Sequence, residues 1–151
     1  MNFTPKFDSP SDVAKKSYES VTQYMATDLV TFGPEDEIGT VIAKLNEFQI
    51  SGAPVLNDRK ELIGIISEQD CLRFIIDSVY HNQPISKNLV KDYMQKDLIT
   101  IPYESDVVDV ANMFLKHRFR RFPVVKDGVL KGQVSKRDIL RAAMKIKFTT
   151  W

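Results

Sequence analysis

The sequence has few of the residues on which covalent, metal and membrane chemistry depend. It has one cysteine, Cys71, so an internal disulfide is impossible, and this scarcity is typical of a reducing compartment. Its two histidines, His81 and His117, fit no zinc-site spacing, and no phosphate-binding glycine loop or nucleophile elbow occurs. No apolar run approaches the roughly 20 residues that span a bilayer. We therefore expect a cytoplasmic, non-catalytic protein without a metal site or membrane insertion.

An excess of charge of either sign is also missing. The chain has 21 Lys+Arg against 20 Asp+Glu, a formal net charge of +1, which argues against a nucleic-acid-binding protein. At 151 residues with 43% hydrophobic content, it has room for one ordinary domain or two very small ones.

The informative feature is internal repetition. Residues 24–58 align with 93–127 at ten identities in 35 positions, and residues 62–73 align with 130–141 at six identities in twelve. The offset changes by one residue in a polar turn, where length changes are well tolerated. We conclude that the chain is a tandem duplication.

Both copies predict the same order of elements. A short extended segment comes first, then a helix that starts near a proline and acidic residues, then a hairpin and a closing helix. In copy one these elements are 29–32, 38–48, 53–56 with 62–67, and 71–79; in copy two they are 98–101, 107–114, 122–125 with 129–135, and 139–146. A β-α-β-β-α unit of about 50 residues buries too little surface alone. The prediction is one α+β fold whose two repeats pack sheet to sheet with pseudo-symmetry.

This organisation divides the chain into five segments. We expect an N-terminal helical extension over 1–20, repeat one over 21–80, a linker over 81–89, repeat two over 90–146 and a tail over 147–151. The segments outside the repeats are too short for an effector domain, so any output would pass through a separate protein.

Polar residues that agree between the copies mark the candidate site. They are Thr31 with Thr100, Ser67 with Ser135, and Asp70 with Asp138. Each serine and aspartate forms a Ser-x-x-Asp corner between a strand and a helix, the pattern of a capping box. The same corner offers backbone N–H groups to a phosphate and a carboxylate to ribose hydroxyls. Both interpretations remain open and are compatible.

The duplicated unit has a Y-M-x-x-D-L-[VI]-T opening, a Pro-Val strand and paired G-x-x-S-x-x-D corners. In these features the sequence resembles a tandem pair of CBS domains over nearly the whole chain. The resemblance implies two clefts between the copies that bind AMP, ADP, ATP or S-adenosylmethionine as regulatory ligands. It places Thr31, Ile50, Ser51, Gly52, Ala53, Pro54, Ser135 and Asp138 at one cleft. It places Thr100, Phe119, Arg120, Arg121, Phe122, Pro123, Ser67 and Asp70 at the other.

The copies differ most in positive charge near these clefts. Copy two has Arg120-Arg121 where copy one has Ser51-Gly52, and Lys136-Arg137 where copy one has Glu68-Gln69. Arginine forks suit phosphate oxygens, so we expect the second cleft to prefer a phosphorylated adenosine ligand over S-adenosylmethionine. A solvated basic face and contact with nucleic acid are the competing interpretations.

Two classes of function remain. The first is a nucleotide-sensing module that regulates a separate enzyme or transporter, and the second is a ligand-free dimerisation or docking module. Because CBS pairs commonly associate as discs of two pairs, the resemblance also implies a homodimer.

Overall fold

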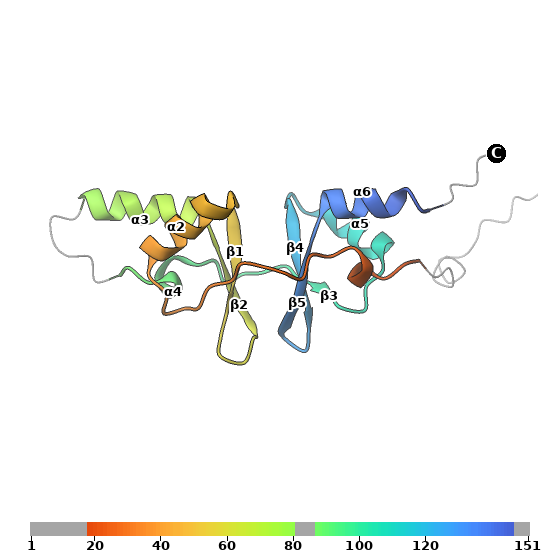
Figure 1. Ribbon diagram of the computed structural model, residues 1–151, viewed down its shortest axis with the longest axis horizontal. Helices are drawn as coiled ribbons and strands as arrows, with labels where there is room; N and C mark the ends of the chain where they lie inside the picture. The colour runs from red at the N-terminus through yellow and green to blue at the C-terminus, as the bar shows by residue number, and fades with distance from the viewer. Residues whose placement is uncertain (1–17, 81–86, 147–151) are drawn as a thin grey trace, which may run out of the picture.

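Two β-hairpins face each other at the centre of the molecule, and helices flank them on the outer sides (Figure 1). The computed structural model describes residues 18–80 and 87–146. Repeat one contains the 3-10 helix η1 (Val21–Gln23), α2 (Ile38–Phe48), β1 (Gly52–Leu56), β2 (Leu62–Ser67) and α3 (Glu68–Tyr80). Repeat two contains α4 (Val90–Tyr93), β3 (Ile101–Pro102), α5 (Val107–Lys116), β4 (Arg121–Lys126), β5 (Val129–Ser135) and α6 (Lys136–Ala143).

The hairpins pair in equivalent registers. Gly52 lies opposite Ser67 in the antiparallel pair β1–β2, and Arg121 lies opposite Ser135 in the pair β4–β5. The two hairpins also join at their tips, where the backbone N–H of Leu62 donates to the carbonyl of Gly128. The predicted α+β arrangement of two β-α-β-β-α repeats is confirmed.

The first extended segment differs between the copies. In copy two, β3 runs parallel to β4, and the N–H of Tyr103 donates to the carbonyl of Val125. In copy one, the predicted strand over 29–32 is reduced to an isolated bridge between Phe32 and Val55. The position equivalent to Tyr103 is Pro34, which has no N–H to extend the pairing.

The opening helices are exchanged between the repeats. Val21 of η1 is buried in the core of copy two, and Val90 of α4 is buried in the core of copy one. After each helix the chain pairs with the β-hairpin of the other copy, through backbone bonds of Ala26 to Gln133 and of Gln95 to Ile65. The two repeats therefore interlock and share their packing.

Several further expectations concern the ends of the chain. The N-terminal helix over 1–20 falls almost wholly on residues 1–17, and the tail over 147–151 and most of the linker also lie outside the described residues. The closing helix of copy two ends at Ala143, so Ile146 lies beyond it instead of in its last turn. Within 18–80 and 87–146, no helix is long and apolar enough to cross a membrane.

Candidate functional site

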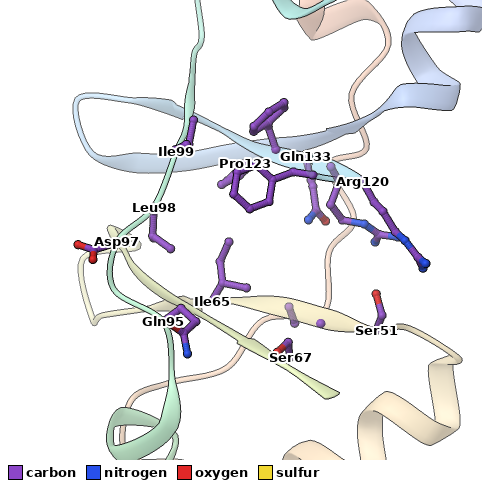
Figure 2. Close-up of a pocket in the computed structure, with 15 residues that line it drawn as sticks. Ser51, Ile65, Ser67, Gln95, Asp97, Leu98, Ile99, Arg120, Pro123 and Gln133 are labelled. Atoms are coloured by element: carbon purple, nitrogen blue, oxygen red, sulfur yellow. The ribbon is translucent and has the colours of Figure 1, made fainter. Parts of the chain in front are cut away.

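A cavity of about 350 Å³ lies between the two hairpins (Figure 2). Its volume falls in the range of roughly 300–1,000 Å³ that is usual for small-molecule sites. Both copies contribute walls: residues 51–53 come from copy one, and residues 97–99 and 119–123 come from copy two. The cavity is therefore a property of the paired repeats.

Backbone hydrogen bonds fix the two walls in equivalent ways. The first N–H of α3, from Glu68, donates to the carbonyl of Ser51 at 2.9 Å. The first N–H of α6, from Lys136, donates to the carbonyl of Arg120 at 3.3 Å. In each copy, the segment before the Pro-Val strand is thus hydrogen-bonded to the first residue of the closing helix of the same copy.

The two ends of the cavity differ in charge. Figure 2 shows Arg120 and Ser51 at one end and Asp97 at the other, with Leu98 and Ile65 between them. Arg121 also lines the cavity. Among the ion pairs of residues 18–80 and 87–146, none involves Arg120 or Arg121, and both side chains are exposed. Two guanidinium groups are therefore free to meet an anion at one end of a largely apolar cavity.

A second, smaller cavity of about 250 Å³ occupies the pseudo-symmetric position. Asp28, Leu29 and Val30 line it where Asp97, Leu98 and Ile99 line the larger one. Gly52, Arg121 and Gln133 border both cavities. The smaller cavity has Arg121 but lacks Arg120 in its lining, so the duplicated site is asymmetric in charge.

The Ser67–Asp70 corner is closed by a dense set of hydrogen bonds. Asp70 is completely buried, and its Oδ2 accepts from the Ser67 N–H at 2.8 Å and from the Ser67 hydroxyl at 2.9 Å. Its Oδ1 accepts from Arg73, which also pairs with it ionically, and from the Gln95 amide at 2.9 Å. In return the N–H of Asp70 donates to the Ser67 hydroxyl at 3.4 Å, which completes the reciprocal cap.

The Ser135–Asp138 corner is more open. Asp138 accepts from the Ser135 N–H at 2.9 Å and from Arg141 at 3.1 Å. Its side chain is 19% exposed, against 1% for Asp70. The capping-box interpretation therefore holds at both corners. Within residues 18–80 and 87–146, a side chain of the other copy bonds to the aspartate at the first corner and not at the second.

The structure brings together half of the predicted site residues in the larger cavity. These are Ser51, Gly52, Ala53, Ser67 and all of 119–123. Ile50 lines the smaller cavity. Neither of these two cavities is lined by Thr31, Pro54, Asp70, Thr100, Ser135, Lys136, Arg137 or Asp138.

The residues expected at two separate clefts partly share one cavity. Ser51, Gly52 and Ala53 were expected at the cleft opposite Arg120 and Arg121, but they line the same cavity as those arginines. The reason is that the hairpins face each other, so the pre-proline segments of both copies border one gap (Figure 2).

Several lining residues lie outside the predicted set. Asp97 and Leu98 are identical to Asp28 and Leu29 in copy one, so identity between the copies could have marked them as candidate site residues. No such signal marks Gln95, because its counterpart is Ala26.

Cys71 and His117 lie outside the two cavities. Cys71 is buried, and this burial, more than the nearby Asp70 and Glu68 carboxylates, raises the pKa of its thiol. His117 caps the C-terminal end of α5 and packs near Phe119 and Phe122. Within 18–80 and 87–146, no group of three or more His, Cys, Asp or Glu side chains could hold a metal ion.

Comparison with known proteins identifies the family. The CBS domain profile matches twice, over residues 21–77 and 90–145. The chain belongs to the CBS-domain family. CBS pairs are generally regulatory modules, not catalytic ones.

Solved CBS pairs have the same fold. CBSX2 from Arabidopsis thaliana superposes with a TM-score of 0.72 at 26% identity, over 87% of this chain and 98% of that chain. A structure of CBSX2 in complex with AMP gives a TM-score of 0.70 at 27% identity, over 86% of this chain and 99% of that one.

Curated relatives are longer than this chain. An uncharacterized protein of Methanocaldococcus jannaschii is 29% identical over 123 residues, which cover 82% of this chain and 42% of that protein. Inosine-5'-monophosphate dehydrogenase of Staphylococcus aureus is 32% identical over 108 residues, which cover 70% of this chain and 20% of the enzyme. The chain thus spans less than half the length of either relative.

Proposed function

We propose that this CBS pair is a regulatory module that binds a phosphorylated adenosine ligand in the cavity between its hairpins. The observation that carries the proposal is the pair Arg120–Arg121 at one end of an apolar cavity, without an ion-pair partner among the described residues. A guanidinium that lines a partly enclosed site is well suited to phosphate oxygens.

The lining chemistry suggests how such a ligand would lie. Its adenine would contact the apolar side chains of Ile65, Leu98 and Ile99, and its phosphate would meet the arginines at the other end. The ribose would then come near Ser67, which lines the cavity beside the Asp70 corner. In this arrangement the protein binds and orients the ligand and performs no bond chemistry.

A relative supports this ligand class. CBSX2, at 27% identity, has been crystallised in complex with AMP. S-adenosylmethionine carries a sulfonium cation and no phosphate, so the free arginines favour AMP, ADP or ATP over it. The regulated protein would be a separate enzyme or transporter, or a further domain joined to these repeats.

The test is calorimetric titration with AMP of the wild-type protein and of Arg120→Ala and Arg121→Ala. Loss of one charge-assisted contact should weaken binding by about 10- to 100-fold. Arg118→Ala is the matched control, because Arg118 is exposed but does not line the cavity. Equal affinity for AMP in all four proteins would refute the arginine–phosphate assignment.

A second candidate function, assembly through the closing helices, has its own observation. Leu72 is 60% exposed and Val79 is 67% exposed on α3, and Leu140 is 70% exposed on α6. Both helices lie along the same side of the molecule (Figure 1). We propose that this side packs against the same side of a second copy, because burial of these exposed apolar side chains would favour such a contact.

Light scattering after size exclusion tests the assembly. Leu72→Glu and Leu140→Glu should convert a dimer to a monomer. Leu115→Glu, at an 86% exposed leucine on α5, should leave the mass unchanged. A monomeric wild-type protein at tens of micromolar would contradict the proposed dimer.

A further inference from the structure

Asp70 has no acceptor position left for a ligand. A carboxylate offers about four lone-pair sites on its two oxygens. The N–H and hydroxyl of Ser67 occupy Oδ2, while Arg73 and the amide of Gln95 occupy Oδ1. A ribose hydroxyl that donates to Asp70 must therefore displace one of these four donors.

Gln95 is the donor that can leave most easily. The bonds from Ser67 belong to the helix cap, and Arg73 is charged and pairs ionically with the carboxylate. Gln95 is neutral, exposed and the only one of the donors that comes from the other repeat. It is also a lining residue of the cavity, so it lies beside the proposed ligand.

The other copy has no equivalent of this contact. The residue that aligns with Gln95 is Ala26, whose side chain has no donor. Among the described residues, Asp138 accepts only from Ser135 and Arg141, and it remains partly exposed. Two corners with the same Ser-x-x-Asp sequence thus differ in the Gln95 contact, and also in the bond that the Ser67 hydroxyl donates to Asp70.

We infer that Gln95 is a latch residue: its amide holds the Asp70 carboxylate, and adenosine hydroxyls must displace it before they can bind there. The inference rests on the proposed binding of adenosine ligands in this cavity. Gln95 therefore sets the affinity of the larger cavity by competition, whereas Ala26 leaves the Asp138 corner unlatched. It acts through Asp70, so it is a positioning residue.

The latch can be removed without disturbing the chain path. Gln95 pairs with Ile65 through its backbone, with N···O distances of 2.8 and 3.0 Å. Ala26 makes the same two backbone bonds to Gln133, at 2.8 and 2.9 Å. Alanine is therefore compatible with this position, and Gln95→Ala should fold normally.

The experiment is a calorimetric titration of the wild-type protein and Gln95→Ala with AMP and with 2′,3′-dideoxyadenosine monophosphate, which lacks the ribose hydroxyls. Gln95→Ala should bind AMP about three- to ten-fold more tightly, the size expected for release of one hydrogen bond. Its affinity for the dideoxy ligand should be unchanged. The gain should also vanish in Asp70→Asn/Gln95→Ala relative to Asp70→Asn.

The matched control is Gln133→Ala, a glutamine that lines the same cavity and makes no bond to Asp70. It should leave the ratio of AMP to dideoxy affinities unchanged. AMP binding that is equal or weaker in Gln95→Ala, or an equal gain for both ligands, overturns the latch while the proposed function stands. If neither wild type nor Gln95→Ala binds AMP, both proposals fail.

Discussion

Replacement of Asp70 by alanine should destabilise the protein more than the same change at Asp138. Both substitutions remove a helix cap, which contributes about 1 kcal/mol. Both also remove the acceptor of a half-buried serine N–H, that of Ser67 or that of Ser135. At Asp70, which is completely buried, the change in addition leaves the Ser67 hydroxyl and the Gln95 amide without their acceptor, at about 1–3 kcal/mol. Arg73 is half exposed, so loss of its ion pair adds less than about 1 kcal/mol. We expect losses of about 3 kcal/mol for Asp70→Ala and about 1.5 kcal/mol for Asp138→Ala.

These losses can be measured by urea unfolding and by thermal melting without ligand. For a chain of this size, 1 kcal/mol corresponds to roughly 2–4 °C in Tm, so Asp70→Ala should melt about 5 °C below Asp138→Ala. Asp109→Ala is the control, because Asp109 occupies the equivalent cap position of α5 but is exposed. It should lose only the cap contribution of about 1 kcal/mol. An Asp70→Ala protein as stable as Asp138→Ala would refute the argument from burial.

Three further outcomes follow from the same packing. Gly64→Ala should cost about 1–3 kcal/mol in urea unfolding, because its new Cβ would lie 2.5 Å from Sδ of Met94; a loss below about 0.5 kcal/mol would show that Met94 simply moves away. Burial, followed by the hydrogen bond to Asp77, raises the pKa of Tyr93 to about 12. Its contribution to stability should be complete below pH 10, its unfolded value, and disappear as the pH rises towards 12; Tyr93→Phe should remove that part of the pH dependence. Cys71, buried and with a raised pKa, should react with a thiol reagent only when the chain unfolds, so fast labelling of the native protein would contradict its position.

Repetition made most of the fold predictable. The helix over 38–48 and the strands over 62–67 and 129–135 have the bounds that the repeat alignment indicated. These elements follow from local periodicity and turn residues, which act within one copy. The exchange of η1 and α4 between the repeats could not be predicted, because Val21 and Val90 have the same apolar character whichever core they enter.

The sequence predicted the motif residues of the candidate site but not the side-chain contacts between the two repeats. Arg120 and Arg121 were indicated by their difference from Ser51 and Gly52, and all four line the larger cavity. The contact of Gln95 with Asp70 joins residues 25 positions apart in different repeats, and no sequence period links them. Side-chain contacts of this kind depend on how the two copies dock.

The sequence also did not reveal that the apolar face of α3 points away from the core. Leu72, Ile76 and Val79 have the spacing of a core-facing helix, yet all three are more than half exposed. Periodicity reveals that a helix has an apolar face, but it does not reveal whether the covering surface belongs to the same chain or to another one.

The cavity between the repeats is proposed to bind a phosphorylated adenosine ligand through its phosphate. The most direct measurement is a parallel calorimetric titration of the wild-type protein with AMP and with S-adenosylmethionine. We expect saturable binding of AMP with a lower Kd than that of S-adenosylmethionine, and loss of this preference in Arg120→Ala/Arg121→Ala. Equal or tighter binding of S-adenosylmethionine by the wild-type protein, or no binding of AMP, would contradict it.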